Sequence, residues 1–270
     1  MRIHQKTAPH RVGIIGYGYI GRAIVERLRA DPQNFQLAFV HARRREQADN
    51  IADAEFLANL GDCQSRAPDL VVETAHPAVT RQYGVEIINH ADFMPLSTTA
   101  LTDNDLLSTM LDIAADKETQ LVLAAGALIG GEELIKRSTP WAKVRVTFRK
   151  HPDNIDFSDV DLSPSNITTA KVVFEGSVRQ IAERYPRNVN TMVTAALLST
   201  GLDACEGALV ADPSLDRAIA EVEAWGTDGS YFRTEKQQPA KGVSGTEMVD
   251  SVWHSILQAS GVSANRFHLV

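Results

Sequence analysis

Three glycines, Gly16, Gly18 and Gly21, have the spacing Gly-x-Gly-x-x-Gly. They follow a short apolar run at 11–15 that predicts a buried strand, and apolar residues at helical spacing come after them. Glycines in such a turn let the backbone approach a dinucleotide pyrophosphate, which amides at the helix N-terminus bind. A glycine-rich turn can also serve close packing alone, but a second strand at 35–40 completes a βαβ unit and favours dinucleotide binding. We expect Gly16, Gly18 and Gly21 to bind the pyrophosphate, with Tyr19 and Ile20 as further cofactor contacts.

The residues after the second predicted strand bear on the choice between NAD and NADP. Enzymes selective for NAD usually have Asp or Glu there, where it accepts hydrogen bonds from the adenosine ribose. This chain has His41, followed by Arg43, Arg44 and Arg45. Guanidinium groups suit a 2′-phosphate because they offer forked donors and a permanent charge. We therefore expect His41, Arg43 and Arg44 to favour NADP over NAD, although a solvated basic start to the next helix is the alternative.

Strands and helices alternate through the rest of the first half. Apolar runs at 69–74, 93–98 and 121–125 predict strands, and helical spacing at 79–89 and 103–117 predicts the helices between them. This alternation is typical of a Rossmann-type, doubly wound parallel sheet in an α/β protein, with ligands beyond the carboxyl ends of its strands.

The loops at those carboxyl ends, 74–77, 97–101 and 124–131, should line the nicotinamide end of the cofactor. His76 could contact cofactor or substrate there, or it could be an ordinary turn residue before Pro77. The expected cofactor contacts in these loops are Thr74, Ala75, His76, Thr98 and Thr99.

The second half has a different pattern. Alternating apolar and polar residues at 143–149 and 170–175 predict strands with one solvated face, and 188–198 and 240–258 have helical patterns. We predict a dinucleotide-binding domain at 1–125 and a smaller α+β substrate and dimerisation domain at 126–243. A carboxy-terminal helix within 244–270 is expected to pack back on the first domain.

The bulk composition excludes several classes of protein. A chain of 270 residues with a net charge of −7 is long enough for two domains and lacks the basic surface that nucleic acid or an anionic membrane would need. Its two cysteines have no metal-site spacing, and no run approaches the roughly 20 apolar residues of a membrane span. We expect a cytoplasmic protein without metal, with a small-molecule substrate as its partner.

The whole motif order resembles the L-aspartate dehydrogenase family across residues 11–260. Beyond the glycine loop, the residues that carry this resemblance are Val72-Glu73-Thr74-Ala75, Ser97-Thr98-Thr99-Ala100-Leu101, Gly126-Ala127-Leu128-Ile129-Gly130, Phe174-Glu175-Gly176-Ser177, Tyr185-Pro186-Arg187-Asn188-Val189-Asn190 and Ala211-Asp212-Pro213. The resemblance implies hydride transfer from L-aspartate to NAD(P), with an imine that water converts to oxaloacetate and ammonia. A homodimer is a reasonable expectation for such an enzyme.

The chain departs from the family at several positions. The family has a histidine, taken as the acid/base, where this chain has Ala220; a serine, a glycine and an aspartate are replaced by Ala125, Thr99 and Glu132. Loss of an acid/base costs on the order of 10² to 10⁴ in rate. Either another group carries the proton, or the substrate is a different amine, imine or carbonyl compound. A third reading is a non-catalytic NADP(H)-binding protein.

His151, at the predicted end of a strand, is the first candidate for the missing acid/base, with an exposed strand-end histidine as the alternative. Glu221 and Asp212 are further options, although acids on a polar helix are usually solvated.

For the substrate we expect Lys150, Asn188 and Asn190. Lys150 suits a carboxylate but could be merely solvated, and Asn188 could instead cap the following helix. Asn190 falls inside that helix, where asparagine has little structural reason to lie, so it is also a catalytic candidate.

Overall fold

The computed structural model describes residues 8–241 and 244–262. The chain divides into two compact units: one comprises the residues up to Ala124 together with those from Val249 onward, and the other comprises Ala125–Met248.

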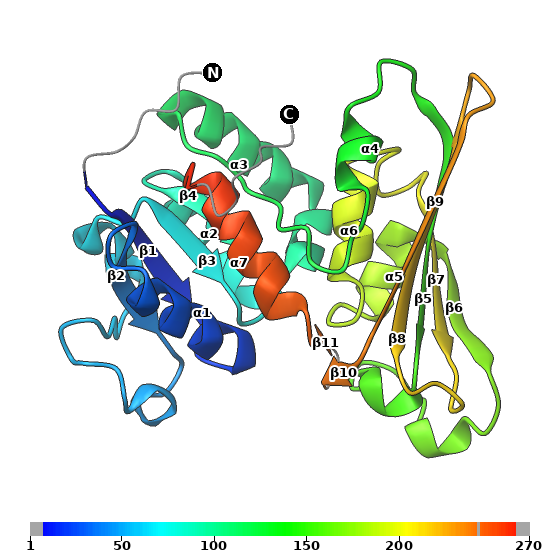
Figure 1. Cartoon of the computed structure of the whole chain (residues 1–270), viewed down its shortest axis with the longest axis horizontal. Helices are drawn as coiled ribbons and strands as arrows, with labels where there is room; N and C mark the ends of the chain where they lie inside the picture. The colour runs from blue at the N-terminus through cyan, green and yellow to red at the C-terminus, as the bar shows by residue number, and fades with distance from the viewer. Residues whose placement is uncertain (1–7, 242–243, 263–270) are drawn as a thin grey trace. The chain divides into compact units, whose positions relative to one another are not determined.

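The first unit is a parallel four-stranded sheet with strand order β2-β1-β3-β4 (Figure 1). Each strand is a short, buried, mostly apolar run, as expected for a sheet covered on both faces. Its strands are β1 (His10–Ile15), β2 (Phe35–His41), β3 (Leu70–Glu73) and β4 (Asp92–Pro95). The Rossmann-type parallel sheet predicted from the sequence is confirmed.

Helices cover this sheet, and short 3-10 turns join them. Asp103 caps α3 by accepting from the amides of Asp105 and Leu106, and α2 packs against α3. On α7, Trp253 packs against Phe35, and Asp250 forms an ion pair with Arg27. The helices and turns are α1 (Tyr19–Ala30), η1 (Arg45–Ala48), η2 (Leu60–Arg66), α2 (Pro77–Ile88), η3 (Thr98–Thr102), α3 (Asn104–Lys117) and α7 (Met248–Ala259).

Two predicted strands of this unit are shorter than the sequence suggested. The run at 93–98 ends as a strand at Pro95, because the amide and hydroxyl of Ser97 turn toward the buried Glu73 carboxylate. The run at 121–125 forms only a parallel bridge between Leu121 and Phe93. Both runs are apolar as predicted, but most of their backbone groups do not form the hydrogen bonds of a β-ladder.

The second unit is a mixed five-stranded sheet with order β6-β7-β5-β8-β9, in which only β5 and β7 are parallel neighbours. Helices α5 and α6 pack on one face of it (Figure 1). Its strands are β5 (Trp141–Lys150), β6 (Lys171–Ser177), β7 (Glu206–Ala211), β8 (Ala218–Gly226) and β9 (Tyr231–Gln238). Its helices and turns are α4 (Gly131–Ile135), η4 (Pro152–Asn154), η5 (Pro164–Asn166), α5 (Val178–Arg184) and α6 (Asn190–Leu197).

The two faces of this sheet differ in chemistry. One face gives Val144, Val146 and Phe148 to an apolar core shared with α5 and α6. The other carries ion pairs between strands, such as Arg145 with Glu175 at 2.7 Å and with Glu206 at 3.3 Å. The alternation along β5 follows from the period of two residues in a strand.

Two predictions for the second half are wrong. The polar helix expected around Glu221 is strand β8, paired with β5 and β9 on its two sides. The helix expected at 240–258 begins only at Met248, because β10 (Ala240–Lys241) and β11 (Ser244–Gly245) pair with each other before it.

Candidate functional site

The glycine loop lies between β1 and α1, and the reason for glycine differs among its three positions. Gly16 has φ of +94°, and a Cβ on Gly21 would lie 2.1 Å from the Gly16 carbonyl oxygen. Packing therefore requires both. A Cβ on Gly18 would meet no atom of the described chain within 4 Å, and the φ of −84° is open to any residue. The free space at Gly18 fits the close approach of a pyrophosphate to the start of α1.

Tyr19 and Ile20 form the first turn of α1, and Arg22 on the same helix holds the loop. Its guanidinium donates to the carbonyls of Tyr17 and Gln47 and lies over the Tyr17 ring. A hollow at this place is lined by Tyr17, Gly18, Tyr19, Arg22, Ala23 and Glu26.

A buried carboxylate organises the loops at the carboxyl edge of the parallel sheet. Glu73, the last residue of β3, is fully buried. Its Oε1 accepts from the amides of Ala75 at 2.5 Å and His76 at 2.7 Å and from the Ser97 hydroxyl at 3.0 Å. Its Oε2 accepts from the Ser97 amide at 3.1 Å and the Thr80 hydroxyl at 3.2 Å. Burial raises the pKa of Glu73, and the hydrogen bonds from Ala75, Ser97 and His76 oppose that shift.

Both oxygens of Glu73 face amide donors, which can only donate, so the hydrogen-bond pattern fits the ionised carboxylate. One side chain thereby joins loop 74–77 to the start of η3. Glu73 was not among the functional residues predicted from the sequence. The available signal was an acid at the end of an otherwise apolar strand, which needs buried partners.

The predicted cofactor residues of these two loops have mixed environments. The Thr74 hydroxyl donates to the carbonyls of Ile15 and Gly16, which ties β3 to the glycine loop. His76 caps α2, because its Nδ1 accepts from the Ala78 amide. Thr98 and Thr99 are buried in η3.

The basic cluster after β2 separates into two kinds of arginine. Arg45 turns back on its own loop, where it donates to the Ile51 carbonyl, pairs with Asp53 and lies over the Phe56 ring. Arg43 and Arg44 are exposed and form no ion pair with any residue of 8–241 or 244–262. His41 is held by a 2.8 Å contact between Nδ1 and the Leu57 carbonyl. Two cationic side chains thus remain available beside the ribose end of the predicted dinucleotide site.

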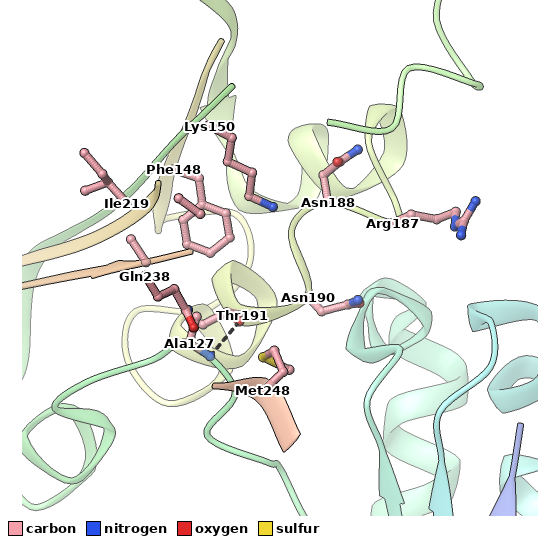
Figure 2. A pocket seen from close by; sticks show the side chains of 12 residues that line it. Ala127, Phe148, Lys150, Arg187, Asn188, Asn190, Thr191, Ile219, Gln238 and Met248 are labelled. Carbon is pink, nitrogen blue, oxygen red and sulfur yellow. Dashed lines mark hydrogen bonds between the residues drawn. The ribbon is translucent and has the colours of Figure 1, made fainter. Parts of the chain in front are cut away.

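The second unit contains a small cavity of about 80 Å³ where β5, β8 and the start of α6 meet (Figure 2). Since one water occupies roughly 10–15 Å³ of such a cavity, this one suits a molecule of a few heavy atoms, far smaller than a nucleotide. It is lined by Ala127, Phe148, Lys150, Arg187, Asn188, Asn190, Thr191, Ala218, Ile219, Ala220, Gln238 and Met248.

Lys150 is the buried charge of this cavity. Only 7% of the residue is exposed, and its Nζ lies 5.5 Å from the centre of the Phe148 ring. Burial lowers the pKa of Lys150 from 10.5 to about 8. Lys150, predicted from the sequence as a substrate contact, therefore lines the cavity in a largely water-excluded position.

The two asparagines have separate duties. The Asn188 side chain accepts from the Asp156 amide and donates to the Asp156 carbonyl, each at 2.8 Å, so it fastens the loop after η4. It does not cap α6, whose N-cap is Val189. Asn190 is the first residue of α6 and lines the cavity (Figure 2).

Arg187 is a second cation that lines the cavity, although the sequence motif that contains it gave no role to this residue. Its guanidinium pairs with Asp156 at 2.6 Å, and its side chain remains half exposed. Lys150 on the sheet and Arg187 before α6 give the cavity two positive groups. Among its lining residues, all within the described chain, none carries a carboxylate.

The acid/base candidates do not gather here. His151 does not line the cavity; its Nδ1 accepts from the Asp153 amide and lies 3.5 Å from the Asp153 carboxylate. Asp212 accepts from the amide and hydroxyl of Ser214. Glu221 is buried beside Arg233 at 2.9 Å and Arg149 at 3.5 Å. Ala220, in contrast, lines the cavity directly opposite Phe148 in the β5–β8 register.

Within the described ranges, no three His, Cys, Asp or Glu side chains gather as ligands for a metal ion. In the same part of the chain, no helix is both long enough and apolar enough to cross a membrane.

Comparisons with known proteins agree with both units. Residues 16–124 match the homoserine dehydrogenase NAD-binding domain family, and 134–255 match the aspartate dehydrogenase C-terminal family. The chain is 35% identical to an aspartate dehydrogenase domain-containing protein of Xenopus tropicalis, covering 93% of this chain and 95% of that protein. An L-aspartate dehydrogenase of Nitrosopumilus maritimus is 25% identical over 85% of this chain and 88% of its own length. The crystal structure of an aspartate dehydrogenase from Thermotoga maritima has a TM-score of 0.73 at 23% identity, covering 97% of this chain and 99% of that one.

The glycine loop yields a paired prediction. Gly21→Ala places a methyl group against the Gly16 carbonyl, so we expect a lower melting temperature and no dinucleotide binding. Gly18→Ala meets only open space, so the protein should keep its melting temperature yet bind NADPH at least tenfold more weakly. Thermal unfolding and calorimetric titration measure the two effects. Unchanged NADPH affinity in a folded Gly18→Ala variant would contradict this placement of the pyrophosphate.

Glu73 yields a second prediction. Glu73→Gln puts an amide NH₂ against donors of loop 74–77 and Ser97, so unfolding free energy should fall by roughly 1–3 kcal/mol. Cofactor affinity should fall with it, because those loops lose their shared acceptor. Urea unfolding and NADPH titration measure both effects. Glu86→Gln, an exposed carboxylate on α2, is the matched control and should change neither.

Proposed function

Because the chain belongs to the aspartate dehydrogenase family, we propose that it is an NAD(P)-dependent dehydrogenase of a small amino dicarboxylate such as L-aspartate. Its first unit is an NAD(P)-binding domain. The observation that carries the choice of substrate is the cavity of the second unit, which is small, lined without carboxylates and flanked by Lys150 and Arg187.

The charges of this cavity suit an anion with two negative ends. Transfer of a carboxylate out of water is costly unless a cation or several donors meet it. Arg187 offers a permanently charged, forked donor, and Asn190 offers an amide beside it. Phe148 and Met248 add apolar side chains to the lining, which suits the short carbon chain between two carboxylates.

In the proposed reaction the first unit holds the cofactor and the cavity holds the amine. When bound, the oxidised nicotinamide accepts a hydride from the substrate Cα. The glycine loop binds the pyrophosphate through backbone amides, while loop 74–77 and η3, joined by Glu73, contribute the contacts at the nicotinamide end. The residues of the cavity bind the carboxylates and orient the amino group.

We further propose that NADP is the preferred cofactor. Arg43 and Arg44 support this choice, since both are exposed, carry no ion pair within the described residues and follow β2, where the adenosine ribose binds in this fold. A homodimer in the cytoplasm stays a prediction.

A second candidate function is the turnover of a different amine, imine or carbonyl compound. The alanine at position 220, inside the cavity, favours it, because the family resemblance places a histidine there. A non-acidic substrate as the sole active compound would select this alternative. A protein that binds NADP without turnover on any compound would select a non-catalytic role.

The primary test is turnover. With NADP⁺ and L-aspartate, the near-ultraviolet absorbance of reduced nicotinamide should rise, and oxaloacetate, ammonia and NADPH should reverse it. Asn190→Ala should lower kcat/KM by about tenfold or more, since one buried hydrogen bond to a charged group contributes about 1.5–3 kcal/mol. L-Alanine, which lacks the second carboxylate, is the control substrate. If the protein binds NADPH but the absorbance changes in neither direction of the reaction, the proposal is contradicted.

The cofactor preference has its own test. The double variant Arg43→Ala, Arg44→Ala should weaken NADPH binding by about tenfold or more while leaving NADH binding within about twofold, because only NADPH carries the 2′-phosphate. Calorimetric titration with both nucleotides measures the ratio. Arg184→Ala removes an exposed charge from α5 and serves as the control. Equal loss for both nucleotides would argue against a phosphate contact.

A further inference from the structure

The cavity places a buried amine beside the position where the family resemblance puts its histidine. Strands β5 and β8 are antiparallel, with Phe148 opposite Ala220 and Arg149 opposite Ile219. Phe148 and Lys150 are two residues apart on β5 and so share a face, and Figure 2 shows their side chains next to each other in the cavity. An imidazole at position 220 would enter the same space that the Lys150 side chain borders.

We propose that the Lys150 amine is the proton carrier of this protein, in the place of the histidine that position 220 lacks. The inference rests on the proposed function and names the catalytic group of that same cavity. It assigns different duties to the two cations, with Arg187 as the carboxylate anchor and Lys150 as the acid/base.

The environment of Lys150 suits this role. A general base works best when its pKa lies near the working pH, and burial brings the pKa of Lys150 to about 8. Its backbone is fixed, since the Lys150 carbonyl accepts from the Asp212 amide at 2.8 Å. Arg187 cannot share the task, because a guanidinium stays protonated in proteins.

The charged groups around Lys150 come from several elements. Arg187 precedes α6 and forms an ion pair with Asp156 from the loop after η4. Asp212 follows β7 and is hydrogen-bonded to Ser214, and His151 caps η4. On β8, Glu221 alternates to the other side from Ala220, and there it pairs with Arg149 and Arg233. Of the charged groups named here, all within the described residues, only Arg187 lines the cavity.

The proton steps balance with lysine as carrier. The neutral Lys150 amine first takes a proton from the substrate ammonium and releases it to solvent, which frees the nitrogen lone pair to form the C=N bond as the hydride leaves Cα. Lys150 then takes a proton from the water that adds to the imine carbon and gives it to the departing nitrogen. The C–N bond breaks, the remaining hydroxyl proton goes to ammonia, and the carbonyl forms. The products are a keto acid, ammonium, one proton and the reduced cofactor that holds the hydride.

Two variants separate proton transfer from simple charge. Lys150→Met removes the amine with little change in shape, and Lys150→Arg keeps a positive charge that cannot titrate. Both variants should lower kcat by about 10²- to 10⁴-fold. In the oxidative direction, kcat/KM of the wild type should rise with pH around pH 8, and this limb of the pH profile should vanish in Lys150→Arg. A carboxylate anchor would behave differently, because Lys150→Arg would keep kcat.

A double variant tests the shared space directly. Ala220→His in the Lys150→Met background should recover at least tenfold in kcat, because the imidazole supplies a proton carrier in the same cavity. Lys143→Met is the matched control, since Lys143 is on the same strand but exposed and paired with Glu206. It should leave kcat and the pH profile unchanged.

A measurement without substrate or cofactor gives an independent readout. The unfolded chain holds a proton on Lys150 up to about pH 10.5, whereas the folded protein releases it near 8. Between these values the unfolded state binds more protons, so the contribution of Lys150 to stability rises with pH. The melting temperature of wild type relative to Lys150→Met should therefore increase from pH 8 to pH 10, with Lys143→Met following wild type.

The possible outcomes are distinct. Loss of the pH limb, rescue by Ala220→His and the relative rise in melting temperature support the inference. If the wild type turns over an acidic amino acid and Lys150→Arg keeps both its kcat and the pH limb of kcat/KM, the role of Lys150 is overturned while the proposed function stands. Wild type that is inactive on every acidic amino acid and keto acid overturns the proposed function and this inference with it.

Discussion

The loops of the first unit that are predicted to hold the cofactor depend on the hydrogen bonds to the buried Glu73 carboxylate. A buried charge is tolerated only when donors replace the water it has lost. Five donors do so here, from the loop after β3, from α2 and from the residue before η3. Two loops far apart in sequence are therefore held to one acceptor, at the edge where a doubly wound sheet binds its ligands.

The second unit has a buried charge of the opposite sign at a corresponding place, the end of strand β5. Lys150 is the last residue of that strand, and its amine reaches the cavity (Figure 2). The two charges differ in what surrounds them. Five hydrogen-bond donors hold Glu73 in a structural role, whereas burial lowers the pKa of Lys150 toward the range in which an amine exchanges protons.

Sequence reasoning was most successful where the signals were local. The glycine spacing and the short apolar runs predicted the first sheet, because a parallel strand buried on both faces has an almost continuous apolar sequence. Strand β8 was missed because its run of alanine and glutamate favours a helix by local preference. Its pairing with β5 and β9 overrides that preference, and such pairing depends on residues far away in sequence.

The same limit applies to the functional residues. Lys150 and Asn190 were predicted from the sequence as substrate contacts, and both line one cavity. The depth of burial of Lys150 and the contribution of Arg187 depend on how α6 packs against the sheet, which no local pattern reports. His151 seemed the natural proton carrier from its type alone, yet its Nδ1 caps a turn.

The most direct test of hydride transfer follows the hydrogen atom itself. Wild-type protein would be incubated with NADP⁺ and L-aspartate deuterated at Cα, and the recovered cofactor analysed by mass spectrometry and proton NMR. Hydride transfer from Cα should give reduced nicotinamide that carries one deuterium at C4, in amounts equal to the keto acid formed. Cofactor that binds but remains oxidised, or is reduced without deuterium, would contradict it.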